Sequence, residues 1–212
     1  MDILNEKDCK RFLKNGKLSK PFLESSFVKE KVMKDYDAKI KERENYTEIE
    51  SLCLWIKHNV KYVGDDEEFL VKNKFQRTAK QIWESKKATG CTDYALLFVT
   101  FARQLGFSAT LLHTAEFSWI SRLQNNGDYK VHYGHTFCEC FYKGRWVLVD
   151  PTRVKIEFDY NPNCLKLNYL VGESSTFVPY FRGLDLGVKQ SIKQHNKQME
   201  QECINLELGA EK

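Results

Sequence analysis

In the sequence Thr89-Gly90-Cys91-Thr92-Asp93-Tyr94-Ala95, a cysteine stands between a glycine and the start of an apolar segment. Apolar residues then recur every three or four positions up to Gly106, which predicts a helix with a glycine stop. Cys91 is expected at the N-terminus of this helix, where unpaired N–H groups and the helix dipole stabilise a thiolate. It is therefore a candidate nucleophile, and the alternative is a small buried residue, as most free cysteines are.

A second informative segment, residues 134–152, contains two aromatic and β-branched runs separated by Lys143-Gly144. This pattern predicts a β-hairpin. With the turn centred on Lys143-Gly144, strand alternation places His135 and Asp150 on one face as diagonal neighbours, about 7 Å apart at Cα. The same face is expected to carry Phe137, Glu139, Leu148 and Thr152.

An imidazole next to a carboxylate is the arrangement that activates a thiol. We expect Cys91 to lie across from the hairpin face that carries His135 and Asp150. The base would then activate the nucleophile, and the carboxylate would fix the imidazole tautomer. The candidate catalytic residues are Cys91, His135 and Asp150, which meet in space and not in sequence.

At these residues the sequence resembles the transglutaminase-like superfamily of cysteine enzymes, a branch of the papain-like proteases. The matching segments are Gly90-Cys91-Thr92-Asp93, Arg103-Gln104-Leu105-Gly106, residues 134–139 and residues 146–152. The resemblance implies that Cys91 is the nucleophile, His135 its acid/base partner and Asp150 the orienting residue. It also implies activity on amides, since members are transglutaminases, proteases or deglycosylating amidases.

The expected fold class is α+β, with a transglutaminase-like core of helices packed on an antiparallel sheet. We expect a single transglutaminase-like domain over residues 1–212, with residues 1–46 as an N-terminal helical elaboration and residues 183–212 as a C-terminal helical tail. The polar segment 117–133 is interpreted as a loop. A helix is predicted over residues 46–62, and further strands over residues 108–114, 154–158, 165–171 and 177–181.

Other polar residues have two interpretations each. Gln81 follows Thr78 in a capping-box pattern, which we favour over a role in binding an oxyanion. The acidic residues 65–68 indicate a helix start more than a cation site. Glu139 is interpreted as electrostatic support for the site, and His195 as a partly exposed helix residue. Cys138 and Cys140 are expected to pack in the core.

Composition excludes several classes of protein. The 212 residues are 42% apolar, which suits a globular core, and the 33 basic and 29 acidic residues are intermixed, so a net charge of +4 does not indicate nucleic-acid binding. The sequence begins without a signal-peptide pattern, and its longest apolar run, Ala95 to Val99, is too short to span a membrane. Seven cysteines without paired metal spacing fit a reducing compartment, so we expect a cytoplasmic protein.

The expected function is cysteine-dependent acyl transfer or hydrolysis on an amide group of a peptide or protein, with no cofactor and no metal. The backbone N–H of Cys91 would hold the oxyanion together with a second donor that the sequence does not identify. Two alternatives stay open: a transglutaminase that uses an amine acceptor, and a catalytically silent peptide-binding or protein-binding module. Water is favoured over an amine because the sequence shows no sign of calcium-binding or accessory domains. Substrate identity and oligomeric state are left open.

Overall fold

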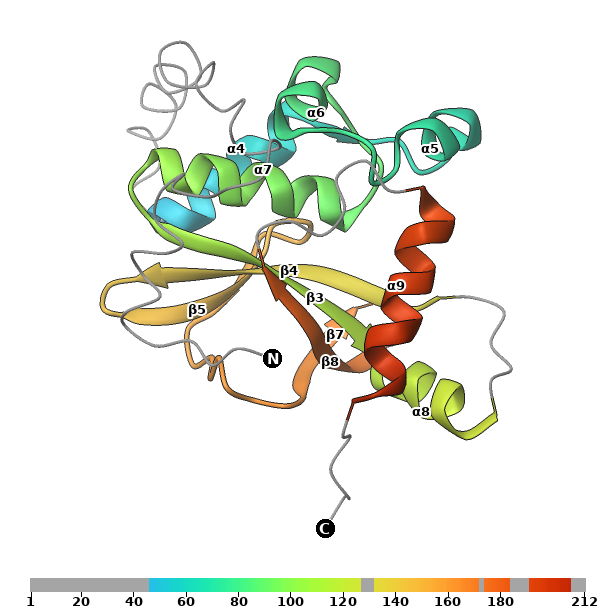
Figure 1. The fold of residues 1–212 in the computed structure, drawn as a ribbon. Coiled ribbons are helices and arrows are strands. Elements are labelled where there is room, and N and C mark those ends of the chain that lie inside the picture. Colours follow the sequence, from blue (N-terminus) through green and yellow to red (C-terminus); the bar gives the residue numbers. More distant parts are fainter. Residues whose placement is uncertain (1–45, 127–131, 172–173, 184–190, 207–212) are drawn as a thin grey trace.

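The computed structural model describes residues 46–126, 132–171, 174–183 and 191–206. The helical patterns expected before residue 46 lie outside these ranges. Within them the chain forms the predicted α+β fold, in which helices surround a curled sheet (Figure 1). None of the described helices has the length and hydropathy needed to cross a lipid bilayer.

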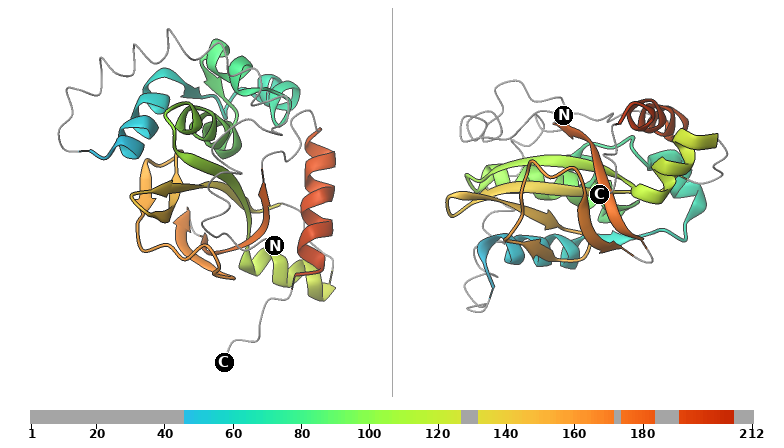
Figure 2. Two further views of the ribbon diagram at one scale, coloured as in Figure 1. Left: turned by 60° about the vertical axis from the view of Figure 1, so that its left-hand side comes forward. Right: turned by 90° about the horizontal axis from the view of Figure 1, so that it is seen from below.

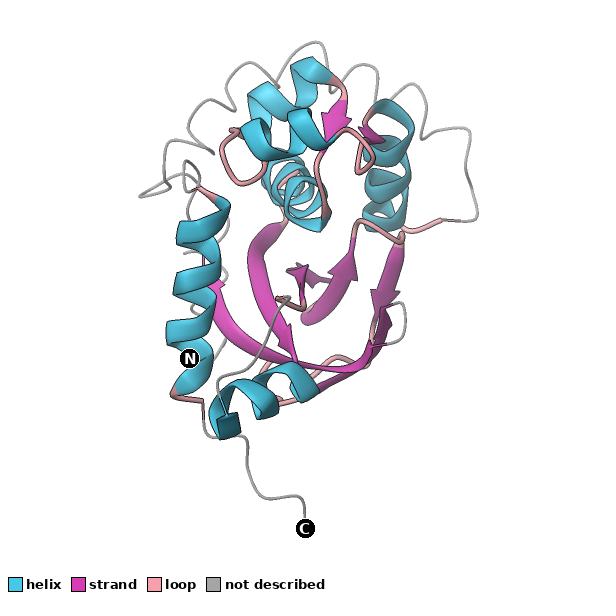
Figure 3. Ribbon diagram, turned by 90° about the vertical axis from the view of Figure 1, so that its right-hand side faces the viewer, coloured by secondary structure: helices cyan, strands magenta, loops and turns pink. Residues whose placement is uncertain are grey.

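The centre of the fold is a six-stranded antiparallel sheet with the order β6-β5-β4-β3-β8-β7. Figure 2 and Figure 3 show how strongly this sheet curls. Its strands are β3 (Ser108–Glu116), β4 (Gly134–Tyr142), β5 (Arg145–Asp150), β6 (Lys155–Glu157), β7 (Leu167–Val171) and β8 (Ser174–Gly183). Each predicted strand is therefore present, within a few residues of the predicted bounds.

Six helices pack around the sheet in the described part of the chain. They are α4 (Glu48–Asn59), α5 (Glu67–Asn73), α6 (Ala79–Ser85), α7 (Cys91–Gln104), α8 (Phe117–Asn126) and α9 (Ile192–Ile204). The helix α7 lies on the sheet against β3 and β4, with α4 and α6 on its outer side, whereas α8 and α9 pack together near β8 (Figure 1). A short parallel pair, β1 (Lys61–Tyr62) and β2 (Lys87–Ala88), joins the segment after α4 to the segment before α7.

The helix α7 confirms the prediction made from the apolar spacing after Cys91. All of its residues from Asp93 to Arg103 are buried, because α4, α6 and the sheet enclose it. It ends just before Gly106, whose φ of +92° is a left-handed conformation that suits glycine. The nucleophile candidate thus stands at the first residue of a helix that the core holds firmly.

The β4–β5 hairpin has the predicted register. Tyr142 pairs with Arg145 and Cys138 with Val149, with no bulge between them. Lys143 and Gly144 have φ values of 49° and 85°, the positive values that a tight two-residue hairpin turn requires at both positions. Since the register does not slip, His135 and Asp150 stay on the same face of the hairpin, as expected.

The face of the hairpin that α7 covers differs from the prediction. Cys138, Cys140, Val147 and Val149 join α7 in one hydrophobic cluster, and the Cys138 thiol donates a hydrogen bond to the Ala95 carbonyl. Phe137 and Leu148 belong to a separate cluster with β7 and β8. The helix therefore packs on the face opposite to Phe137, and Cys91 does not lie across from that face. Cys91 lies next to His135 instead, at the N-terminal end of β4.

The segment 117–133 was predicted as a loop, and this is wrong for its first part. Residues Phe117–Asn126 form α8, which buries Trp119, Ile120 and Leu123 against α9. The segment is polar on average, but its apolar residues at positions i, i+1 and i+4 form one helix face. Tertiary packing stabilises this short helix. At its start, a carboxylate oxygen of Glu116 accepts a hydrogen bond from the backbone N–H of Trp119. Residues 127–131 of the expected loop lie outside the described ranges.

Candidate active site

Cys91 is the first residue of α7, and it is partly exposed. Gly90 precedes it in an extended conformation and has no side chain to cap the N–H groups of the first turn. The backbone N–H of Thr136, at the start of β4, donates a hydrogen bond to the Cys91 sulfur. Helix and strand backbones therefore both present donors where a thiolate would form.

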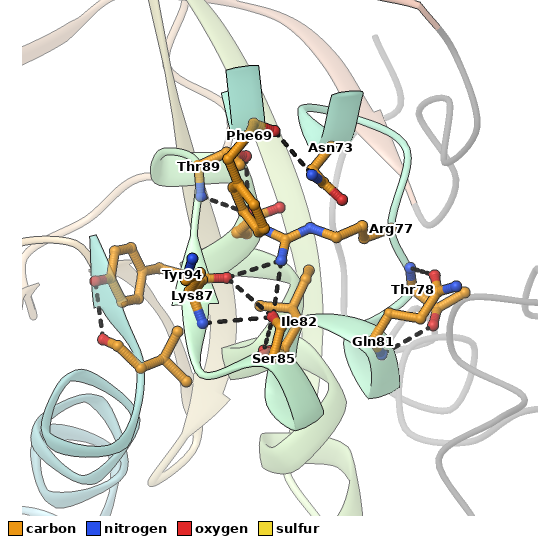
Figure 4. Close-up of polar contacts among 12 residues, drawn as sticks. Phe69, Asn73, Arg77, Thr78, Gln81, Ile82, Ser85, Lys87, Thr89 and Tyr94 are labelled. Atoms are coloured by element: carbon orange, nitrogen blue, oxygen red, sulfur yellow. Dashed lines mark hydrogen bonds and ion pairs between the residues drawn. The ribbon is translucent and has the colours of Figure 1, made fainter. Parts of the chain in front are cut away.

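A buried ion pair fixes the turn that carries Cys91. The carboxylate of Asp93 accepts hydrogen bonds from the backbone N–H and the hydroxyl of Thr89, at 2.7 and 2.8 Å, and from Arg77. Arg77 also donates to the Ser85 hydroxyl and the Lys87 carbonyl, both at 2.9 Å (Figure 4). The approach to α7 is thus tied to α6 and β2. This pair could not be predicted from the sequence, because nothing in the local pattern links Arg77 to Asp93.

His135 and Asp150 are in direct contact. His135 Nε2 lies 3.0 Å from Asp150 Oδ2, and the Asp150 side chain is completely buried. The other carboxylate oxygen accepts the backbone N–H groups of Thr152 and Arg153. Because an ionised carboxylate only accepts hydrogen bonds, His135 carries a proton on Nε2, and Nδ1 is the nitrogen left for Cys91.

The Cys91 thiol and the His135 ring hydrogen-bond to each other and shift each other's protonation. Burial raises the pKa of Cys91, but the positive charge of His135 and hydrogen bonds from His135 and Thr136 outweigh burial and lower it to about 7. Burial lowers the pKa of His135, but the Cys91 thiolate and the Asp150 carboxylate raise it to about 10. Each shift therefore favours the form of the pair in which Cys91 is a thiolate and His135 an imidazolium.

Thr136 and His113 also join the site, and neither was identified as a site residue from the sequence. The Thr136 hydroxyl hydrogen-bonds the Thr92 hydroxyl at 2.9 Å and lies 3.3 Å from His113 Nδ1. Burial, followed by the nearby His195, lowers the pKa of His113 to about 3, so its ring is neutral. The even positions of β4 face α7, and this alternation is the signal that would have pointed to Thr136.

Cys91 lies between two cavities. The smaller, about 130 Å³, extends toward α9 and is lined by His113, His195 and Met199 as well as Cys91 and His135. The larger, about 590 Å³, extends toward α4, β1 and the turn after β5. Both cavities include Cys91 and His135 in their walls, so a chain passing through them would run directly over the thiol.

Two other site candidates lie away from Cys91. Gln81 forms the capping box with Thr78 at the start of α6, as favoured. Glu139, interpreted as electrostatic support for the site, binds Arg182 at 2.6 Å and accepts a hydrogen bond from the Tyr160 hydroxyl. Glu139 is on the predicted face, and the strand registers place Arg182 of β8 on that same face, across β3.

The expectation that His195 is partly exposed is wrong. His195 is buried and stacks on Phe75, with ring centroids 3.8 Å apart. The sequence shows only a polar helix. In the structure, the face of this helix that carries His195 packs against the loop after α5. His195 therefore forms part of the wall of the smaller cavity.

Comparison with known proteins agrees with this fold. The family model described as the transglutaminase-like superfamily matches residues 34–151, more than half of the chain. The crystal structure of a proposed cysteine protease from Cytophaga hutchinsonii is similar at a TM-score of 0.51 and 18% sequence identity. The similarity covers 89% of this chain and 50% of that one, so this chain spans about half of its length. A search of curated proteins finds no match. On the family match and the shared fold, the chain belongs to the transglutaminase-like superfamily.

Proposed function

We propose that the protein cleaves or transfers amide-linked acyl groups of a peptide or protein, with Cys91 as nucleophile, His135 as acid and base, and Asp150 as the residue that orients His135. One observation carries the proposal: a single imidazole hydrogen-bonds both a buried carboxylate and the thiol at the N-terminus of α7. This geometry prepares a nucleophile and a proton donor in the same pair.

The first half-reaction forms a thioester. The Cys91 thiolate attacks the carbonyl carbon of the amide, and the C–S bond forms while the carbonyl electrons move to oxygen. We assign the oxyanion to the N–H groups at the start of α7, for which Gly90 offers no capping side chain. The oxyanion then collapses, the C–N bond breaks, and His135 Nδ1 gives its proton to the leaving amine.

The second half-reaction releases the acyl group. Water attacks the thioester carbonyl and gives a proton to His135 Nδ1; the C–S bond breaks, and the Cys91 thiolate leaves paired with the imidazolium. The acid is released and the starting ion pair is restored. We take water as the acceptor because the larger cavity opens among exposed side chains, including Lys61 and Tyr62, so solvent reaches the thioester. An amine acceptor would enter by the same route.

The test uses a mixture of peptides and a biotin-labelled primary amine, incubated with the wild-type protein, with Cys91→Ala and with Cys91→Ser. New peptide termini or deamidated side chains that appear with the wild type alone support hydrolysis, and incorporation of biotin supports transfer. Neither product with the wild type, at protein concentrations that give a folded circular dichroism spectrum, would contradict the proposal. Retained activity in Cys91→Ala would contradict the assignment of the nucleophile.

A further inference from the structure

Cationic side chains surround the larger cavity beside Cys91, which we call the basic cleft. Its charged lining residues are Lys57, Lys61, Lys74 and Arg153, apart from His135 of the ion pair. No aspartate or glutamate is among the described residues that line it. In a chain whose basic and acidic residues are nearly equal in number, 33 and 29, this local excess of one sign is a distinct feature.

The four cations come from separate parts of the fold. Lys57 belongs to α4, Lys61 to β1 and Lys74 to the segment after α5, while Arg153 follows β5. No basic run in the sequence predicts their convergence, and the fold alone brings them together. The spacing therefore differs from that of a solvated charge run on one helix face.

Neighbouring groups position these cations without removing their charge. Lys57 Nζ donates to the Thr152 backbone carbonyl at 2.6 Å, which holds the ammonium at the edge of the cleft. Arg153 Nε lies 4.0 Å from Asp150 Oδ2, a carboxylate that is already bound to His135 and to backbone N–H groups. Asp93, two residues after Cys91, is neutralised by Arg77. The side chains that line the cleft therefore carry an excess of positive charge.

The inner part of the cleft is apolar. Val60 and Tyr94 are buried there, and the Tyr94 hydroxyl donates to the Val60 carbonyl at 3.0 Å. An apolar floor of low dielectric strengthens the interaction between the surrounding cations and a bound anion. A peptide with carboxylate side chains on an aliphatic stem matches both parts of the surface.

We propose that the basic cleft selects an acidic peptide segment, with aspartate or glutamate side chains next to the amide that Cys91 attacks. The proposal rests on the proposed function, because it names the substrate class for that site. Lys61 and Lys74 contact the carboxylates from opposite elements of the cleft, and the apolar floor takes the methylene groups.

The test measures alkylation of Cys91 by N-iodoacetyl tetrapeptides that contain three glutamates or three glutamines, with iodoacetamide as the reference. Peptide mapping gives the second-order rate constant at Cys91. The glutamate probe is expected to react about 10-fold faster than the glutamine probe at low salt, and about 0.5 M NaCl should remove most of this difference. Equal rates for the two peptides, with rapid alkylation by iodoacetamide, would overturn the acidic-peptide proposal and leave the proposed function intact.

Two double variants distinguish an effect of the cleft from an effect of the net charge of the protein. The double variant Lys61→Gln, Lys74→Gln should lower the glutamate-to-glutamine rate ratio by about 5-fold, since two cations leave the cleft. The matched double variant Lys193→Gln, Lys197→Gln removes the same charge from exposed positions of α9 that do not line either cavity, and it should keep the ratio. An equal fall in both variants would overturn the proposal.

A binding measurement keeps the test independent of thiol chemistry. Fluorescein-labelled Gly-Glu-Glu-Glu and Gly-Gln-Gln-Gln are titrated with the Cys91→Ala protein, and anisotropy gives Kd. Tighter binding of the glutamate peptide, lost in Lys61→Gln, Lys74→Gln, supports the acidic-peptide proposal even if Cys91 alkylates slowly. Slow alkylation by iodoacetamide would by itself count only against the proposed function. No difference between the two peptides would overturn the substrate class.

Discussion

Phe75 and His195 stack with their rings 18° from parallel, which joins the segment after α5 to the C-terminal helix α9. Phe75 has a φ of 61°, an uncommon conformation for a bulky residue, so the surrounding structure holds the ring in place. The contact holds α9 at the smaller cavity, which His195 and Met199 line together with Cys91.

Replacing His195 tests this contact. His195→Ala should lower the free energy of unfolding by about 1–2 kcal/mol, because the stacked ring and its buried area are lost. His195→Phe should keep most of the stability, since it retains an aromatic ring. Urea denaturation of the three proteins measures the difference. Equal stability of the alanine variant and the wild type would show that the stacking contributes nothing.

The same histidine predicts a pH dependence of stability. Burial, followed by the charges of Lys74 and His132, lowers the pKa of His195 to about 4, whereas the unfolded value is 6.5. Between these values the unfolded state binds more protons, so stability should fall as the pH drops from 6.5 toward 4. Urea midpoints across this range measure the fall. It should be smaller in His195→Phe, and the remainder reflects other groups, including His113.

Alkylation of Cys91 by iodoacetamide should accelerate as the pH rises, with a midpoint near 7, because the pKa of its thiol is about 7. In His135→Ala the midpoint should move upward, since burial remains and the positive charge is gone. Cys138 and Cys140 act as internal controls: burial raises the pKa of both thiols, so they should stay unmodified in the native protein. Faster labelling of Cys164 or Cys203 would contradict the assignment.

Asp150→Asn should lower turnover by about two to four orders of magnitude while the melting temperature changes little. The amide oxygen of asparagine still accepts the Thr152 N–H, but its NH₂ group would face His135 Nε2 and favour the wrong tautomer. Parallel measurement of kcat and Tm distinguishes the effects. A loss of stability that accounts for the loss of activity would assign Asp150 a structural role.

The buried pair of Arg77 and Asp93 should be essential as a pair. Arg77→Met leaves a buried carboxylate without its cation and should cost about 3–5 kcal/mol of stability. The double variant Arg77→Met, Asp93→Leu should recover part of that loss. Thermal unfolding of both single variants and the double variant measures the coupling. If the single losses simply add, the two side chains do not act together.

Most of the features that were predicted correctly follow from local sequence patterns. The apolar spacing after Cys91 and the symmetric turn at Lys143-Gly144 each depend on neighbouring residues, and both α7 and the hairpin register were predicted correctly. The face covered by α7 could not be inferred, because both faces of the hairpin are apolar and both are buried. The helix α8 was missed since its average polarity concealed one apolar face.

Tertiary contacts account for the remaining differences. The Arg77–Asp93 pair and the approach of His113 to Thr136 each join elements that no periodicity relates. His195 was predicted to be partly exposed because its helix is polar, and its burial depends on Phe75. Cys91, His135 and Asp150 could be named in advance as candidates, because a helix start and a hairpin register are local features of the sequence.

The position of α9 bears on the order in which the chain is assembled. Cys91, His135 and Asp150 all precede residue 151, whereas His195 and Met199 of the smaller cavity follow Cys91 by roughly a hundred residues. During synthesis from the N-terminus, the thiol and its partners leave the ribosome before the helix that walls one side of them. Closure of such a long loop is entropically costly and comes late in folding. A nascent chain would therefore hold Cys91, the proposed nucleophile, in an open groove until α9 docks.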